Sequence, residues 1–501
     1  MNQTFWLTNS LSGKKEKLET IEPGKLTMYS CGPTVYGLIH IGNLRSGVVS
    51  DLFYRAFQKA GYEVTYVRNY TDVDDKIINK ANEEGRSSEE VAAEFVIEVE
   101  KDYQSAHMLE PTLKTKATEY IQPMIRMIES IIKEGKAYVT ETGEVLFSVE
   151  DFQGYGKLSG KNLEELEAGA RVEVSDQKRS PFDFTLWKPA KPGEPSWDSP
   201  WGKGRPGWHI ECSAMIHEAM GPQIDIHHGG EDLVFPHHEN EIAQSEAACG
   251  KSPFVKVWLH HAFLTFNQTK MSKSLGNVFN ARTFIEQYGG ELARWMLLSV
   301  HYRKILDFSE ETIDHSLSAL ERLYEAKLRA TQLKERRTLR PDPVKESVWG
   351  EFVSQIENYK KELNEAISQD FNTPEVFSVL FRLVREFNRI QSTEGMIDTP
   401  SVSLAAECFL NFIEKDFGEI MGLGGEEPRA YLKFLGEIRS KRMSTSGAES
   451  LSSDEIEVLI QERKDARASK DYAKADEIRN HLLERGVEIK DGPQGTTWKY
   501  V

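Results

Sequence analysis

Apolar positions along the first part of the chain follow two different spacings. The segment Leu26–Tyr29 is short and apolar, as is typical of a buried strand. From Leu44 to Ala60, apolar side chains recur every three or four residues, which predicts an amphipathic helix. Glu63–Arg68 is a second strand-like segment, which begins after Gly61 has ended the helix. Because strand, helix and strand follow one another, we expect a parallel sheet with a right-handed crossover.

A polar loop follows each of these two strands. Cys31–His40 comes after the first strand and Asn69–Asp75 after the second. Ligands bind at the carboxyl ends of parallel strands, so we expect the two loops to meet at one crevice. The first loop leads through Gly42 into the start of a helix, where free N–H groups and the helix dipole favour an anion.

The pattern changes after the first 120 residues. A helix at Ile121–Gly135 precedes short strands and a passage rich in Gly, Pro and Trp, which predicts an insertion into the sheet domain. The α/β pattern resumes at Trp208–Met220 and Ile224–His228. Residues 310–440 are almost wholly helical in pattern, and we expect one charged helix at Ile456–Leu483 before two terminal strands.

These patterns predict an α/β fold with several domains, since 501 residues exceed what one core holds. We expect a Rossmann-like parallel-sheet catalytic domain with a connective insertion, then an α-helical bundle and a small C-terminal α+β unit. The predicted divisions are residues 1–120 (catalytic domain, first half), 121–205 (insertion), 206–266 (catalytic domain, second half with a metal site), 267–315 (a lysine-bearing loop and the segment after it), 316–445 (bundle) and 450–501 (C-terminal unit).

Composition narrows the class of protein. The chain is 39% hydrophobic and 28% charged, and no apolar run reaches the roughly 18–20 residues that span a bilayer. The N-terminus lacks the apolar region of a secretory signal, and four scattered cysteines do not form a disulfide framework, so we expect a cytoplasmic protein. A net charge of −17 argues against a polyanionic partner, although a local basic patch can still bind phosphates.

Four separated residues form a candidate metal site. His237 and Glu241 are four positions apart, which on a helix places both on one face. Cys31 and Cys212, which we expect at two separate strand ends, would add two thiolates. Zinc accepts sulfur, imidazole and carboxylate, so this set predicts a tetrahedral zinc site. From the residues alone, an alternative stays open, in which both cysteines are small buried hydrophobes and the histidines line a polar turn.

Two short motifs carry a family resemblance. The loop Lys270–Ser274 reads KMSKS, and His40-Ile41-Gly42-Asn43 lies upstream of it. Taken alone, the Lys270–Ser274 loop would be read as solvated surface. Together, the loop and His40–Asn43 resemble the KMSKS and HIGH signatures of class I aminoacyl-tRNA synthetases. Asn43 departs from the general motif, which has His at that position. Five further blocks, which together span the chain almost end to end, narrow the resemblance to the cysteinyl-tRNA synthetases. They are CGPTVY (31–36), YVRNYTDVDDK (66–76), GWHIECSAM (207–215), FPHHENE (235–241) and DGPQGTTW (491–498).

The resemblance implies ATP-dependent ligation of L-cysteine to tRNA(Cys) through a cysteinyl-adenylate, with ATP and Mg²⁺ as substrate. One zinc ion would select the cysteine thiolate. The implied metal ligands are Cys31, Cys212, His237 and Glu241. The implied catalytic residues are His40, Lys270 and Lys273. The implied ATP contacts are His40, Gly42, Asn43, Gly230, Asp232 and Lys273, and the implied cysteine pocket is lined by Thr71, Trp208 and His227.

The resemblance also assigns partners and leaves two alternatives. The KMSKS loop and stem-contact region would occupy 267–315, the bundle 316–445 would bind the anticodon stem, and the unit 450–501 the anticodon. A basic run at Lys327–Arg340 fits contact with RNA backbone, and we expect a monomer. One alternative is a cysteine ligase of thiol-cofactor biosynthesis, which lacks the complete C-terminal end. The other is a non-catalytic zinc-dependent RNA-binding protein.

Overall fold

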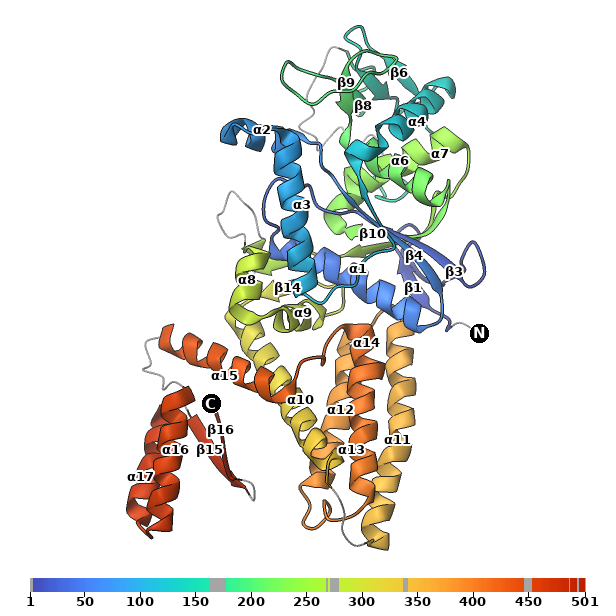
Figure 1. Ribbon diagram of the computed structural model, residues 1–501. Coiled ribbons are helices and arrows are strands. Elements are labelled where there is room, and N and C mark those ends of the chain that lie inside the picture. The colour runs from blue at the N-terminus through green and yellow to red at the C-terminus, as the bar shows by residue number, and fades with distance from the viewer. Residues whose placement is uncertain are drawn as a thin grey trace. The chain divides into compact units, whose positions relative to one another are not determined.

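The computed structural model (Figure 1) describes residues 3–161, 177–266, 269–270, 279–336, 341–445, 453–485, 487–492 and 495–500. The chain folds into two compact units, and each is built from segments that are separated in the sequence. The first unit comprises residues 1–312, 357–380 and 415–423. The second comprises residues 313–356, 381–414 and 424–501.

A five-stranded parallel sheet lies at the centre of the first unit, in the order β11-β10-β3-β4-β5. The strands are β3 (Lys25–Ser30), β4 (Glu63–Tyr70), β5 (Leu113–Lys116), β10 (Ile224–Gly230) and β11 (Val255–His261). The predicted parallel sheet is confirmed. Because the strand order reverses between β3 and β10, the crevice at their carboxyl ends is a topological switch point, where ligands bind in such sheets.

Helices cover both faces of this sheet. Helix α1 (Ile41–Lys59) lies across one face, and α6 (Trp208–Met220) and α7 (Glu239–Cys249) lie on the other (Figure 1). The apolar positions that predicted α1 are fully buried, namely Leu44, Val48, Leu52, Phe53 and Phe57. Helices α2 (Asp75–Glu84) and α3 (Ser88–Ser105) follow β4.

An antiparallel sheet interrupts the parallel one, as the sequence predicts. A 3-10 turn (Ala117–Tyr120) and helix α4 (Ile121–Lys133) lead into it. Its four strands, in the order β6-β7-β8-β9, are Ala137–Val139, Val145–Phe147, Phe184–Pro189 and Gly204–Pro206. Two smaller sheets complete the unit, formed by β1 (Trp6–Asn9) with β2 (Lys14–Lys17), and by β12 (Leu264–Phe266) with β13 (Thr269–Lys270) and β14 (Leu306–Phe308).

The chain after β12 is mainly helical, which confirms the predicted helical region. The helices are α8 (Ala281–Tyr288), α9 (Gly290–Leu298), α10 (Glu310–Lys334), α11 (Pro343–Ser368), α12 (Thr373–Gln391), α13 (Ser401–Asn411), α14 (Gly418–Met421) and α15 (Pro428–Thr445). No helix in the described ranges is long and apolar enough to cross a membrane.

The C-terminal unit differs from its prediction in one respect. The prediction of a single helix at Ile456–Leu483 is wrong, because two helices form, α16 (Ser453–Ala468) and α17 (Tyr472–Glu484). Lys470 adopts a positive φ of 63°, which ends the first helix. Asp471 then caps the second, its carboxylate accepting from the Lys474 N–H at 3.1 Å. Strands β15 (Val487–Gly492) and β16 (Gly495–Tyr500) form the expected hairpin.

Candidate metal and nucleotide site

The loop after β3 carries the first donor of the candidate metal site. Cys31 is the first residue beyond the strand, and the Gly32 N–H donates to the Asn69 side chain at 2.8 Å. A Cβ at Gly32 would lie 1.7 Å from the Asn69 carbonyl oxygen. Only glycine therefore lets the loop cross the end of β4 and present Cys31 to the crevice.

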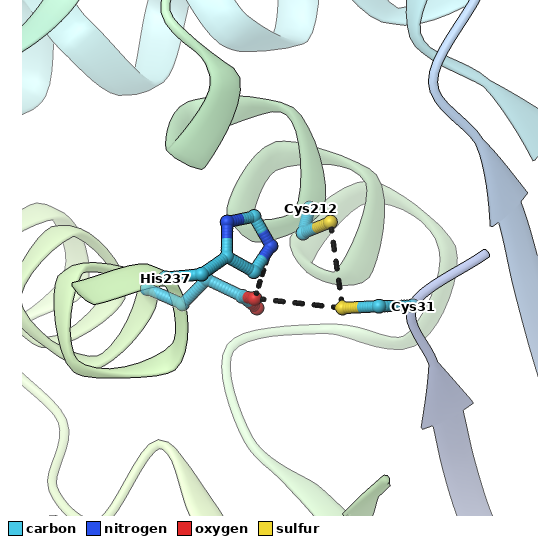
Figure 2. Close-up of side chains that lie close together, drawn as sticks. Cys31, Cys212 and His237 are labelled. Atoms are coloured by element: carbon cyan, nitrogen blue, oxygen red, sulfur yellow. Dashed lines mark hydrogen bonds and ion pairs between the residues drawn. The ribbon is translucent and has the colours of Figure 1, made fainter. Parts of the chain in front are cut away.

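The four predicted metal ligands converge in this crevice, although they come from three separate parts of the chain. Figure 2 shows three of them, Cys31, Cys212 and His237, pointing toward one another. The Cys31 sulfur lies 3.9 Å from the Cys212 sulfur and 3.7 Å from Glu241 Oε1. His237 Nε2 lies 3.0 Å from the same carboxylate oxygen. One ligand atom from each of the four residues lies within 4.8 Å of all the others, and the site is buried except at Cys31, which is half-buried.

One expectation about these donors is wrong. Cys212 does not lie at a strand end; it sits on helix α6, so a helix face and a strand end supply the two thiols. The expected four-residue spacing of His237 and Glu241 does place them together. The two residues lie on either side of a junction between helical segments, because His237 belongs to the helical turn Val234–His238, which runs directly into α7.

Burial and mutual contacts shift the pKa of each donor. Burial and the Cys212 sulfur raise the pKa of Cys31 well above its usual range. The hydrogen bond with Cys31 lowers the pKa of Cys212 to about 6, although burial alone would raise it. Burial would raise the pKa of Glu241, but His227 and His237 lower it to about 2. Burial would lower the pKa of His237, but Glu241 and Cys212 raise it to about 10. At neutral pH the pocket therefore holds a carboxylate and a thiolate beside a protonated imidazole, and a bound metal ion would take the place of that proton.

The donor set fits zinc. Two thiolates on one tetrahedral zinc ion stand about 3.8 Å apart, given Zn–S bonds of about 2.3 Å. The two sulfurs of the pocket are 3.9 Å apart before any ion is added. A second combination, Cys31, His227, His238 and Glu241, is equally compact. It has one thiolate fewer than the first set.

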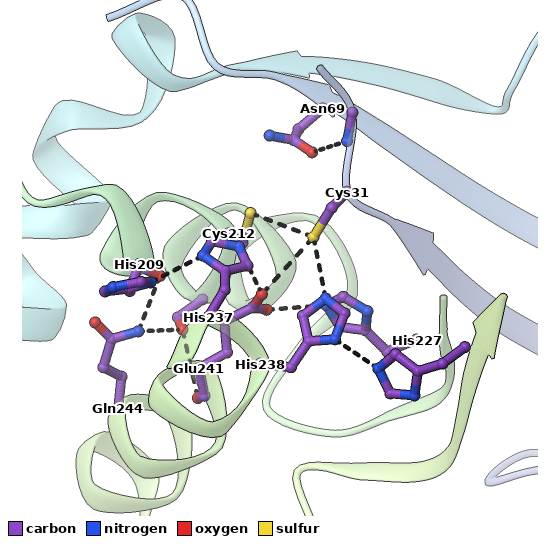
Figure 3. Close-up of polar contacts among 12 residues, drawn as sticks. Cys31, Asn69, His209, Cys212, His227, His237, His238, Glu241 and Gln244 are labelled. Atoms are coloured by element: carbon purple, nitrogen blue, oxygen red, sulfur yellow. Dashed lines mark hydrogen bonds and ion pairs between the residues drawn. The ribbon is translucent and has the colours of Figure 1, made fainter. Parts of the chain in front are cut away.

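Histidines surround the four donors and hold them in orientation (Figure 3). His209 Nδ1 lies 2.9 Å from His237 Nδ1, which leaves Nε2 of His237 facing Glu241. His238 bridges the Cys31 sulfur at 3.5 Å and His260 at 2.8 Å. Outer partners of this kind select the ring orientation of a metal-binding histidine. His209 and His260 were not expected at this site, because only the fold brings them beside it.

The part of the crevice where the sequence predicts nucleotide contacts begins at His40, which is the N-cap of α1. His40 Nδ1 accepts hydrogen bonds from the N–H groups of Gly42 and Asn43 at 3.1 and 3.2 Å. Nε2 therefore carries the proton of the neutral ring and can donate to an anion. A Cβ at Gly42 would lie 2.9 Å from His40 Nδ1, so the glycine makes room for the folded-back ring.

Asn43, the departure from the general motif, has a local role in the fold. Its side-chain oxygen accepts from the His40 N–H at 3.3 Å, which closes a capping box around the start of α1. The site therefore uses one side chain, His40, both to cap the helix and to face the crevice.

The other predicted residues are placed as follows. Thr71 follows β4 and is buried, and its N–H donates to the Pro33 carbonyl at 3.4 Å. Trp208 is 43% exposed and stacks on His237 with ring centroids 4.4 Å apart. His227 stacks on Trp258. Gly230 ends β10, and the exposed Asp232 lies in the turn after it. The backbone of Lys270 lies in β13, and Lys273 lies outside the described residues.

Three known families match separate stretches of this chain. Residues 17–318 match the tRNA synthetases class I (C) catalytic domain, residues 362–423 the DALR domain, and residues 451–498 the cysteinyl-tRNA ligase anticodon binding domain. The first of these covers more than half of the chain.

Individual relatives agree with the family matches. The chain is 47% identical to the cysteine–tRNA ligase of Geobacter sulfurreducens and 45% identical to that of Bdellovibrio bacteriovorus, each over 491 residues and 98% of both chains. Its fold is similar to Mycobacterium tuberculosis methionyl-tRNA synthetase in complex with methionyl-adenylate, with a TM-score of 0.58, 12% identity, and coverage of 82% of this chain and 94% of that one. The chain therefore belongs to the cysteine–tRNA ligase family of class I aminoacyl-tRNA synthetases.

Proposed function

We propose that this protein joins L-cysteine to tRNA(Cys) in two steps. The cysteine carboxylate attacks the α-phosphorus of ATP and expels pyrophosphate, and a ribose hydroxyl of the tRNA then takes the acyl group and releases AMP. The observation that carries the proposal is the single loop Cys31–His40, which presents a thiol to a cation site at one end and a capped helix start at the other.

The amino acid side of the crevice is proposed to read the substrate's sulfur. A zinc ion held by Cys31, Cys212, His237 and Glu241 would supply a soft Lewis acid that prefers the thiolate of cysteine to the hydroxyl of serine. Thr71, Trp208 and His227 are proposed to line the rest of this pocket. Without such a bond, a pocket discriminates between substrates with near-identical side chains by a factor of only about 100 in unfavourable cases.

The ATP side is proposed to stabilise charge on the phosphates. Negative charge develops on the non-bridging oxygens as the α-phosphorus is attacked, so positioned donors lower the barrier. His40 Nε2–H supplies one such donor. Lys270 and Lys273 are proposed to add positive charge from the KMSKS loop, and the Gly230–Asp232 turn to hold the adenosine. Mg²⁺ would accompany the ATP.

The remaining assignments extend the same proposal. Residues 316–445 are proposed to bind the anticodon stem and residues 450–501 the anticodon, with the divisions at 120, 205, 266 and 315 as predicted. We propose that the protein works as a monomer in the cytoplasm.

Cysteine-dependent ATP–pyrophosphate exchange, with tRNA charging measured on the same preparation, tests the proposal. Both activities are expected. Exchange without charging of any tRNA would instead support the thiol-cofactor ligase. If zinc and RNA bound with neither activity, the protein would be the non-catalytic RNA-binding alternative.

A further inference from the structure

One loop of the insertion reaches the helical segment that carries two of the four metal ligands, although the insertion has no role in the proposed function. We call this loop, residues 155–161, the strap; it comes after β7 in the chain. His237 lies in the helical turn before α7, and Glu241 lies in the first turn of α7. The strap contacts this segment before, between and after the two ligands.

The central contact of the strap is with a buried carboxyl group. Glu239, which lies between His237 and Glu241, is almost wholly buried. Its Oε2 accepts from the backbone N–H groups of Leu158 and Ser159 at 3.1 and 2.8 Å. Its other oxygen has no hydrogen-bond partner among the described residues. A buried carboxyl group is costly unless it is hydrogen-bonded, so the start of α7 depends on the strap amides.

Two further contacts lie on the C-terminal side of Glu239. The Tyr155 hydroxyl donates to the side-chain oxygen of Asn240 at 2.5 Å. Lys157 Nζ donates to Glu246 Oε2 at 2.6 Å, which attaches the strap to the second half of α7. Glu241 therefore lies within the stretch of helix that the strap holds.

The strap also reaches the surroundings of the other ligands. Lys161 Nζ lies 4.5 Å from the centroid of the Phe235 ring, just before His237 in the chain. Leu158 is buried in the apolar cluster that also contains Cys212. The strap is thus attached on both sides of His237 and packs into the core that supports one of the thiols.

A glycine gives the strap its folded form. Gly156 has a positive φ of 93°, and a Cβ there would lie 2.0 Å from the Lys161 carbonyl oxygen. The Gly160 N–H donates to the Gly156 carbonyl at 2.8 Å, which closes the turn. Since only glycine fits at position 156, a substitution there opens the strap without altering any metal ligand.

We propose, on the basis of the zinc site in the proposed function, that the strap is a positioning element that keeps zinc bound. It fixes the start of α7, so that His237 and Glu241 stay where a metal ion can bind both of them and the two thiolates. A metal ion leaves when its ligands move away from it, and a strap attached along α7 opposes that movement. The insertion therefore contributes to the metal site through residues that bind no metal.

Release of zinc from the loaded protein into an excess of a chromogenic chelator tests this role. In Gly156→Ala we expect release about tenfold or more faster than in the wild type, the range found when residues that orient metal ligands are lost. Gly154→Ala is the matched control. Gly154 also has a positive φ, of 88°, but a Cβ there would meet no atom within 4 Å. This variant carries similar backbone strain and should release zinc at the wild-type rate.

Leu158→Ala tests the strap without backbone strain. It should also release zinc about tenfold faster, whereas Leu158→Met, which nearly keeps the volume, should release it at the wild-type rate. An excess of zinc should restore cysteine-dependent pyrophosphate exchange in Gly156→Ala and Leu158→Ala, because all four ligands are still present. A purely structural strap would lower the urea midpoint of the zinc-free protein and leave zinc release unchanged.

Wild-type release rates in folded Gly156→Ala and Leu158→Ala would overturn the proposal. Release from Gly154→Ala as fast as from Gly156→Ala would also overturn it, because strain and not the strap would then be the cause. A wild type that binds no zinc would overturn the zinc selection in the proposed function, and this inference with it. Fast release from the two strap variants alone, with exchange restored by zinc, is the result that supports the proposal.

Discussion

At the scale of single residues, the structure shows why one loop combines a thiol and an imidazole. Cys31 is held at the crevice because Gly32 crosses β4 where no side chain would fit. His40 is held because its ring caps α1, which assigns the proton to the nitrogen that faces outward. Both side chains are thus positioned by the backbone before any substrate arrives.

Asn43→Ala should destabilise the protein by about 0.5–1 kcal/mol, because it removes one half of the capping box around His40. The measurement is the urea midpoint of the full chain. Asn43→Asp, which keeps an acceptor oxygen, is the control, and its urea midpoint should lie between those of the wild type and Asn43→Ala. A midpoint identical to that of the wild type would show that the contact contributes nothing.

Cys31→Ser should weaken zinc retention, since a hydroxyl replaces one of the two sulfurs that stand 3.9 Å apart. We expect the apparent zinc affinity to fall about tenfold or more, the range found when a metal site loses a well-placed partner. Competition with a chromogenic chelator measures it. Cys249→Ser is the control, because its sulfur bonds to its own helix at Ser245. Equal zinc content in both variants would remove Cys31 from the site.

At the scale of helices and strands, spacing predicted most of the first unit. The sheet, α1 and the insertion follow from the local sequence pattern. Short apolar segments mark the strands, apolar residues recur at helical spacing in α1, and a passage rich in Gly, Pro and Trp marks the insertion. The position of Cys212 on a helix was not foreseen, since WHIECSAM has no strong amphipathic pattern and helix α6 is buried over most of its length. His209 and His260 were not assigned to the metal site, because their contacts with His237 and His238 form only in the folded chain.

The break between helices α16 and α17 was also not predicted from the sequence. The sequence from Ile456 to Leu483 reads as one charged helix, and the break rests on the left-handed backbone of Lys470. No glycine or proline marks that position, so composition gave no signal for it.

The C-terminal hairpin should lose stability in acid. Asp491 of β15 accepts hydrogen bonds from Arg463 at 2.8 Å and from Arg467 at 2.6 Å, both on α16, and the Arg463 bonds hold its pKa below its usual range. A lowered folded pKa gives stabilisation that is complete above the unfolded value of about 3.9 and disappears as the pH falls through the folded value.

Hydrogen exchange of residues 487–492 checks this prediction. Exchange should accelerate below about pH 4 in the wild type, relative to the intrinsic rate at each pH. Asp491→Asn should exchange faster at neutral pH and show little further acid dependence. If the protection of these amides in the wild type did not depend on pH, the stabilising role proposed for the contact between Asp491 and Arg463 would be contradicted.

At the scale of the molecule, the first unit assembles from distant segments through a few buried charges. Arg294 of α9 pairs with Asp51 of α1, and both side chains are almost wholly buried. The Arg294 guanidinium also donates to the Met421 carbonyl, which ties residues 415–423 back to the sheet domain. A single side chain therefore joins three separate stretches of sequence.

Arg294→Met should destabilise the unit by about 1.5–3 kcal/mol, because it removes one of the two guanidinium partners of the buried Asp51 carboxylate and leaves Arg55 as the other. Guanidinium unfolding measures the loss. Asp51→Asn in the same background should add a further loss, since the carboxylate that pairs with Arg55 is then removed as well. A change below about 1 kcal/mol would show that the pair is solvated in solution.

The central claim is that the pocket of Cys31, Cys212, His237 and Glu241 selects cysteine by its sulfur through a bound zinc ion. The direct measurement is pyrophosphate exchange with cysteine and with serine, before zinc removal, after it, and after zinc is restored. We predict that removal abolishes the preference for cysteine by lowering the cysteine rate, and that zinc restores it. A cysteine preference that survives complete zinc removal in folded protein would contradict the account.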